Sequence, residues 1–76
     1  MKKIVVYGPG CSRCKETEKV VMNVLAETNA EVDFQAVHDM KAIAEAGVMA
    51  TPAVTVDGVV KVSGRIPRPA EVKTWL

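Results

Sequence analysis

The chain has 76 residues, with ten basic and nine acidic side chains and a formal net charge of +1. Its length allows one domain, and we expect residues 1–76 to form it. The near-balance of charge argues against a nucleic-acid or membrane-surface binder, because such proteins need a concentrated basic face. No apolar run reaches the roughly 18 residues of a bilayer span. The first apolar stretch is also too short for a signal peptide, so we expect a cytoplasmic protein.

The first half of the chain alternates between strand and helix patterns. An almost unbroken apolar run over residues 3–7 predicts a strand that is covered on both faces. Apolar and threonine side chains then recur at helical spacing from a start near Ser12 to a stop at residues 29–30. Residues 31–37 alternate between polar and apolar side chains, with Val32, Phe34 and Ala36 on one face, which predicts a second strand.

The second half begins with a short predicted helix and continues with a hairpin. Asp39 is the expected N-cap of the helix, which should end at Gly47. Residues 53–56 and 59–62 are rich in β-branched side chains and flank an Asp-Gly dipeptide, which favours a two-residue type I′ turn. Pro69 suits the first turn of a short final helix that we expect to reach the last residue.

The resulting order, β-α-β-α-β-β-α, predicts an α/β fold with a four-stranded mixed sheet flanked by three helices. The two strands that are joined by a helical crossover should be parallel, whereas the hairpin adds antiparallel strands. Helices are expected on both faces of this sheet.

The chain has only two cysteines, Cys11 and Cys14, and two residues separate them. A disulfide between them would close a very small loop and would constrain little of the unfolded chain. A chemical role therefore explains the pair better than a structural one, although redox sites and metal sites share this spacing.

The chain resembles the thioredoxin/glutaredoxin superfamily, and most closely its short thioredoxin-like redox-active disulfide proteins. The resemblance rests on Cys-Ser-Arg-Cys at residues 11–14, between the first strand and the first helix, and on Thr51-Pro52 immediately before the hairpin. It implies a thioredoxin-like fold in which Pro52 follows a cis bond and its loop packs against the active-site cysteines. It also implies a thiol–disulfide oxidoreductase that acts in electron transport on disulfide-containing protein substrates.

The sequence departs from the superfamily pattern at three places. Gly10 stands where thioredoxins usually carry Trp, and Ser-Arg replaces their Gly-Pro between the cysteines. Val5 falls near the position of the family's buried carboxylate. The Pro-Tyr and Thr-Val-Pro motifs of glutaredoxins are missing as well. The electron donor, a thioredoxin-reductase-type enzyme or glutathione, is therefore left open.

The position of the pair at a predicted helix start assigns a role to each cysteine. Free backbone N–H groups and the positive end of the helix dipole favour a thiolate there. Arg13 and Lys15 add positive charge, so we predict a lowered pKa for Cys11, an exposed nucleophile. Cys14, inside the first turn, should be shielded and should act as the resolving thiol.

Other candidate residues shape the site. A cis bond would present the backbone of Ala50 or Thr51 to an extended substrate segment, which could pair with it like a strand. Tyr7 either lines the site or belongs to the core. The predicted catalytic residues are thus Cys11 and Cys14, and the predicted site-shaping residues are Tyr7, Ser12, Arg13, Ala50, Thr51 and Pro52.

Four further residues receive structural interpretations. Gly8 and Gly10 should let the backbone turn sharply before Cys11. His38 is interpreted as a loop or capping residue rather than a metal ligand, because no set of soft ligands accompanies it. Gly64 should end the second hairpin strand, at a place where relatives hold a glycine pair close to ligands.

Other functions stay open beside the redox hypothesis. Soft-metal chaperones also place a CxxC pair before a first helix, and thiolates at this spacing suit Cu(I). Their order is β-α-β-β-α-β, however, whereas here a helix over residues 39–46 precedes the hairpin. Two chains could share a zinc ion, and a non-catalytic thioredoxin-fold interaction module is a further alternative. We expect a monomer that carries no metal and no cofactor.

Overall fold

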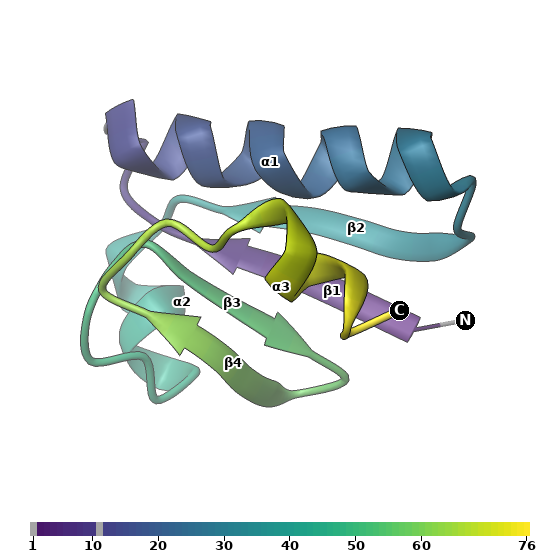
Figure 1. Ribbon diagram of the computed structural model, residues 1–76. Helices are drawn as coiled ribbons and strands as arrows, with labels where there is room; N and C mark the ends of the chain where they lie inside the picture. Colours follow the sequence, from purple (N-terminus) through teal and green to yellow (C-terminus); the bar gives the residue numbers. More distant parts are fainter. Residues whose placement is uncertain (1, 11) are drawn as a thin grey trace.

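A computed structural model describes residues 2–10 and 12–76 and has four strands and three helices (Figure 1). In chain order these are β1 (Lys2–Tyr7), α1 (Ser12–Thr28), β2 (Val32–Val37), α2 (Met40–Glu45), β3 (Ala53–Val56), β4 (Val59–Ser63) and α3 (Pro69–Lys73). The order and the α/β class confirm the prediction from the sequence. No helix in the described ranges is both long and apolar enough to cross a membrane.

The sheet has the strand order β2-β1-β3-β4, which places β1 and β3 at its centre. β1 pairs parallel with β2, to which α1 connects it, and antiparallel with β3. β3 and β4 form the antiparallel hairpin. All four residues of β3 are buried, as expected for a central strand covered on both faces.

Helices cover both faces of the sheet (Figure 1). α1 and α3 lie on one face, and α2 lies behind the sheet on the other face, where Ile43 is its buried residue. Because side chains alternate along a strand, Ile4 and Val6 of β1 face α1 and α3, whereas Val5 faces the opposite side. The main core cluster is almost wholly aliphatic and consists of Ile4, Val6, Val21, Val24, Val54, Val56, Val62, Val72 and Trp75.

The predicted turn and cap residues have the expected geometry. Asp57 and Gly58 have φ values of 52° and 84°, the positive pair that a type I′ turn requires. The Asp39 carboxylate accepts a hydrogen bond from the Lys41 N–H at 3.1 Å and so caps α2. Gly47, just beyond this helix, has a φ of 78°, which suits its predicted role as the helix stop.

Two details differ from the predictions. α3 ends at Lys73, and beyond it the N–H groups of residues 74–76 donate to carbonyls three residues back, the tighter pattern of a helix end, while Trp75 is buried in the core. Ala36, predicted on the same face as Val32 and Phe34, is exposed, whereas those two are half-buried. Its strand, β2, lies at the edge of the sheet, and an edge strand is covered less completely than a central one.

Candidate functional site

Four segments meet at one end of the sheet, the end at which β1 stops. Tyr7, the last residue of β1, lies opposite Val37 of β2 and Ala53 of β3. Ala53 in turn lies opposite Ser63 of β4. The same end of the sheet therefore holds the residues that follow β1, β2 and β4 and those that precede β3. We call this region the site edge, and it comprises residues 8–10, 38, 50–52 and 63–65.

Cys14 lies in the first turn of α1 and is fully buried, as predicted for the shielded cysteine. The backbone of Gly8 lies directly against it. A Cβ atom at Gly8 would come within 2.1 Å of the Cys14 Sγ and 2.8 Å of its Cβ, both far below ordinary contact. Cys11, the predicted nucleophile, lies outside the described residues, between Gly10 and Ser12.

The close approach to Cys14 corrects the interpretation of Gly8. The sequence predicts that both glycines let the backbone turn sharply, but of the two only Gly10, with a φ of 92°, has a left-handed backbone. Gly8 does not have a positive φ. It must lack a side chain because any Cβ atom would occupy the space of the Cys14 side chain.

The segment before β3 is held at the same edge. The Thr51–Pro52 peptide bond is cis, and Pro52 is buried. The Gly64 N–H donates to the Pro52 carbonyl at 2.9 Å, and a Cβ atom at Gly64 would lie 3.2 Å from the Ala50 Cβ. Gly64 therefore does more than end β4, because it also joins the end of that strand to residues 50–52.

The other predicted site-shaping residues lie around this edge with different exposures. Ser12 and Arg13 are exposed at the start of α1, and the Arg13 carbonyl accepts a hydrogen bond from the buried Thr17 hydroxyl at 2.9 Å. Ala50 is exposed and Thr51 is half-buried. Tyr7 is half-buried as well, at the last position of β1, which is compatible with both roles considered for it.

His38 lies in the loop between β2 and α2, in agreement with its loop interpretation, but its contacts with the site edge are not predicted from the sequence. Its Nδ1 lies 2.9 Å from the Gly8 carbonyl oxygen, and its Nε2 lies 3.9 Å from a carboxylate oxygen of Glu18 on α1. Capping of α2 falls instead to Asp39. The parallel pairing predicted for the first two strands indicates this contact, because the residues that directly follow two adjacent parallel strands become neighbours. In the described ranges, no group of three or more His, Cys, Asp and Glu side chains is placed to hold a metal ion.

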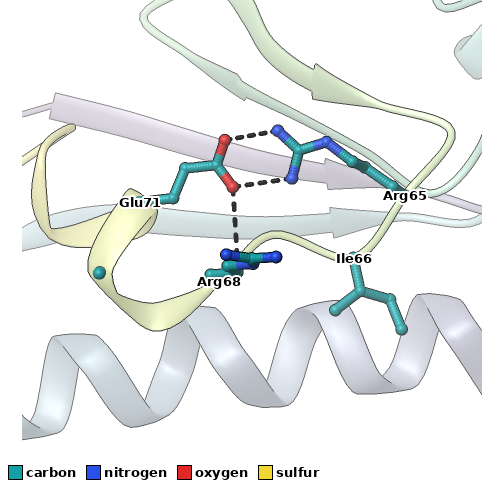
Figure 2. Close-up of a pocket in the computed structure, with 5 residues that line it drawn as sticks. Arg65, Ile66, Arg68 and Glu71 are labelled. Atoms are coloured by element: carbon teal, nitrogen blue, oxygen red, sulfur yellow. Dashed lines mark hydrogen bonds and ion pairs between the residues drawn. The ribbon is translucent and has the colours of Figure 1, made fainter.

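A separate pocket of about 520 Å³ lies on the connection from β4 to α3 (Figure 2). Arg65, Ile66, Arg68, Ala70 and Glu71 line it, and none of them is a predicted site residue. The Glu71 carboxylate accepts two hydrogen bonds from the Arg65 guanidinium, at 2.8 and 2.5 Å, and one from the Arg68 N–H at 3.3 Å. These bonds hold the connection that follows Gly64 in place, and they pair the Glu71 carboxylate with the Arg65 guanidinium.

The Arg65–Glu71 pair predicts a pH-dependent contribution to stability. The hydrogen bonds from Arg65 and then from the Arg68 backbone lower the pKa of Glu71 from 4.5 to about 2. A carboxyl whose pKa is lowered by folding stabilises the protein above its unfolded pKa, and this contribution is lost as pH falls towards the folded pKa. The difference in urea midpoint between wild type and Glu71→Gln should therefore shrink from pH 5 to pH 2.

The control for this prediction is Glu16→Gln, which removes an exposed carboxylate of α1. The difference in urea midpoint between Glu16→Gln and wild type should change little over the same pH range. The Glu71 effect should be modest and should weaken in high salt, because the pair is close to solvent. A Glu71→Gln difference that stays constant down to pH 2 would contradict the prediction.

Comparison with known proteins agrees with this fold. The profile of the Thioredoxin domain family matches residues 2–76. The chain is 37% identical to a thioredoxin of Methanothermobacter thermautotrophicus over 76 residues, which cover all of this chain and 99% of that protein. It is 34% identical to a thioredoxin of Methanocaldococcus jannaschii, again over all of this chain and over 87% of the other.

Proposed function

The chain belongs to the thioredoxin family, and we propose that it is a thiol–disulfide oxidoreductase whose reacting groups are Cys11 and Cys14. Its substrates are disulfides in proteins, and a reductase of the thioredoxin-reductase type or glutathione returns it to the dithiol form. The position of Cys14 carries the proposal. A buried sulfur in the first helical turn, packed against the Gly8 backbone, suits a thiol that reacts second and only with a partner already bound at Cys11.

The proposed cycle has two exchange steps. The Cys11 thiolate attacks one sulfur of the substrate disulfide, so that a mixed disulfide forms and the other substrate sulfur leaves as a thiolate that takes up a proton. Cys14 then loses its proton and attacks the Cys11 sulfur. The mixed disulfide breaks, the second substrate thiol leaves, and the protein keeps a Cys11–Cys14 disulfide. Two electrons and two protons have passed to the substrate.

The location of the motif favours this chemistry. Cys11 directly precedes Ser12, the first residue of α1, where unpaired helix N–H groups and the helix dipole stabilise negative charge. No acidic side chain occupies the first turn of α1 to oppose that effect. The exposed Ala50 and the half-buried Thr51 offer backbone groups to an extended substrate segment at the same edge.

A soft-metal carrier is disfavoured by the order of the elements. Carriers of this size have a hairpin directly after the second strand, whereas α2 stands between β2 and β3 in this protein. The CxxC pair alone still suits Cu(I). A protein that is isolated with about one copper ion per chain, bound through both thiols, would therefore support the carrier and contradict the redox proposal.

Removal of the resolving thiol should trap the substrate. In Cys14→Ser the second exchange step is blocked, so mixed disulfides between Cys11 and its partners should accumulate and should be released by dithiothreitol. The measurement is non-reducing electrophoresis and mass spectrometry of the captured adducts. The double variant Cys11→Ser/Cys14→Ser is the matched control. Equal capture by both variants would refute the proposed order of attack.

A further inference from the structure

We propose that His38 is a positioning residue for the Cys11–Cys14 dithiol. Its imidazole holds the Gly8 backbone against Cys14 and so sets how readily the two cysteines form their disulfide. This inference rests on the proposed function, because it concerns the reactivity of the same two thiols. The structure supports it through one chain of contacts that runs from the ring to the Cys14 sulfur.

The first contact fixes the backbone of Gly8 to the end of β2. The Gly8 N–H donates to the Val37 carbonyl at 2.9 Å, and the Gly8 carbonyl lies 2.9 Å from the His38 Nδ1. A carbonyl oxygen can only accept, so Nδ1 carries the hydrogen that it donates. Val37, the last residue of β2, and His38, which follows it, therefore bind the two polar backbone groups of Gly8. The residue after Gly8 is Pro9, which offers no N–H of its own.

The second contact joins Gly8 to Cys14. The space that a Gly8 side chain would need is filled by the Cys14 Sγ and Cβ, so the position of the Gly8 backbone limits where the sulfur can lie. Residues 8–10 also lead directly to Cys11. A shift of Gly8 would therefore alter the position of one thiol directly and the path of the chain to the other.

The ring also reaches the helix that carries Cys14. Its Nε2 lies 3.9 Å from the Glu18 carboxylate, one turn beyond Cys14 on α1, and the Gly10 Cα lies near enough that a Cβ there would be 3.8 Å from Nδ1. His38 therefore stands between the turn that leads to Cys11 and the helix that holds Cys14. Half of its side chain (51%) is exposed, so its burial contributes little to the core, and its contacts with the turn are its main role.

The consequence concerns the equilibrium between dithiol and disulfide. In exchange with oxidised dithiothreitol, two electrons and two protons pass from Cys11 and Cys14 to the reference disulfide, which becomes a dithiol. The equilibrium constant depends on the effective concentration of one cysteine at the other, which falls when the turn that leads to Cys11 and packs against Cys14 is held less firmly. Loss of the His38 bond should therefore favour the dithiol and make the pair less reducing.

The test compares three substitutions at His38. Asparagine can place its side-chain N–H₂ where Nδ1 lies and should keep the bond to Gly8, whereas alanine cannot, and glutamine places its amide farther out, near the position of Nε2. The equilibrium constant for disulfide formation in dithiothreitol buffers should fall about 3- to 10-fold in His38→Ala and His38→Gln, which corresponds to about 14 to 30 mV. His38→Asn should stay within about twofold of wild type.

Each outcome decides a separate point. A His38→Ala constant equal to that of wild type, or a His38→Asn constant equal to that of His38→Ala, would overturn the positioning role. If His38→Ala does not fold, as judged by urea unfolding, the comparison of His38→Asn with His38→Gln decides instead. The equilibrium constant of Glu18→Gln shows whether the contact between His38 Nε2 and Glu18 also contributes to disulfide formation. A wild-type protein that forms no Cys11–Cys14 disulfide at all would overturn the proposed function rather than this inference.

Discussion

A protein in which Cys11 is replaced by serine should reduce insulin disulfides no faster than dithiothreitol does alone. A serine hydroxyl is not ionised at neutral pH and cannot form the mixed disulfide, whereas a thiolate is the attacking species in every exchange step. The assay follows the turbidity of reduced insulin over time, with dithiothreitol as the electron source. The loss should be complete rather than partial, because no second thiol is exposed to take over the attack: Cys14 is fully buried.

The control for this experiment is Asn23→Ser, an exposed position farther along α1 that should keep wild-type turnover. Urea unfolding of both variants should show that their stabilities are close to that of wild type. Insulin reduction by Cys11→Ser at the wild-type rate would remove Cys11 as the nucleophile and, with it, the proposed cycle.

Among substitutions that add a single methyl group, Gly8→Ala should lower the free energy of unfolding the most. The new Cβ would lie 2.1 Å from the Cys14 Sγ and 2.8 Å from its Cβ. The sulfur can rotate away, but the Cβ is fixed to the helix, so the segment before Cys11 or the start of α1 must move. Overpacking of this kind costs about 3 kcal/mol, a large share of the 5–15 kcal/mol of a typical domain.

Two further variants separate this clash from ordinary effects of glycine replacement. Gly58→Ala, at a φ of 84° with no atom within 4 Å of the new methyl group, should cost only about 1–2 kcal/mol of backbone strain. In a Cys14→Ala background, where the sulfur is absent, the cost of Gly8→Ala should fall by about 1 kcal/mol or more. A free energy of unfolding for Gly8→Ala within about 0.5 kcal/mol of wild type would contradict the close approach.

Much of the fold follows from patterns that are local in the sequence. The Asp-Gly dipeptide between two β-branched runs is sufficient to predict the hairpin, because few residues adopt the positive φ values found at Asp57 and Gly58. Capping by Asp39 depends on a bond to a backbone N–H only two residues away. Interactions of this range do not depend on the rest of the chain, so a pattern can predict them.

The errors concern contacts between distant segments. The conformational freedom of glycine predicts a turn at Gly8, but the neighbour across the loop, Cys14, is what requires a glycine there. His38 stands alone in the sequence, and its bond to Gly8 spans 30 residues and depends on the parallel register of β1 with β2. The alternation of polar and apolar residues correctly predicts the strand that contains Ala36, but it cannot reveal that this strand lies at the edge of the sheet.

The start of β1 and the last residues of the chain lie together, far along β1 from the site edge (Figure 1). The Lys2 Nζ donates to the Trp75 carbonyl at 2.6 Å, at the start of the strand whose other end leads to Gly8 and Cys11. A fluorescent reporter or an affinity handle fused after Leu76 would therefore start at the opposite end of β1 from Gly8 and the Cys14 thiol that packs against it. Trp75, the single tryptophan, is buried at that remote end, so its emission should report the unfolding of the core and should change little when the dithiol is oxidised.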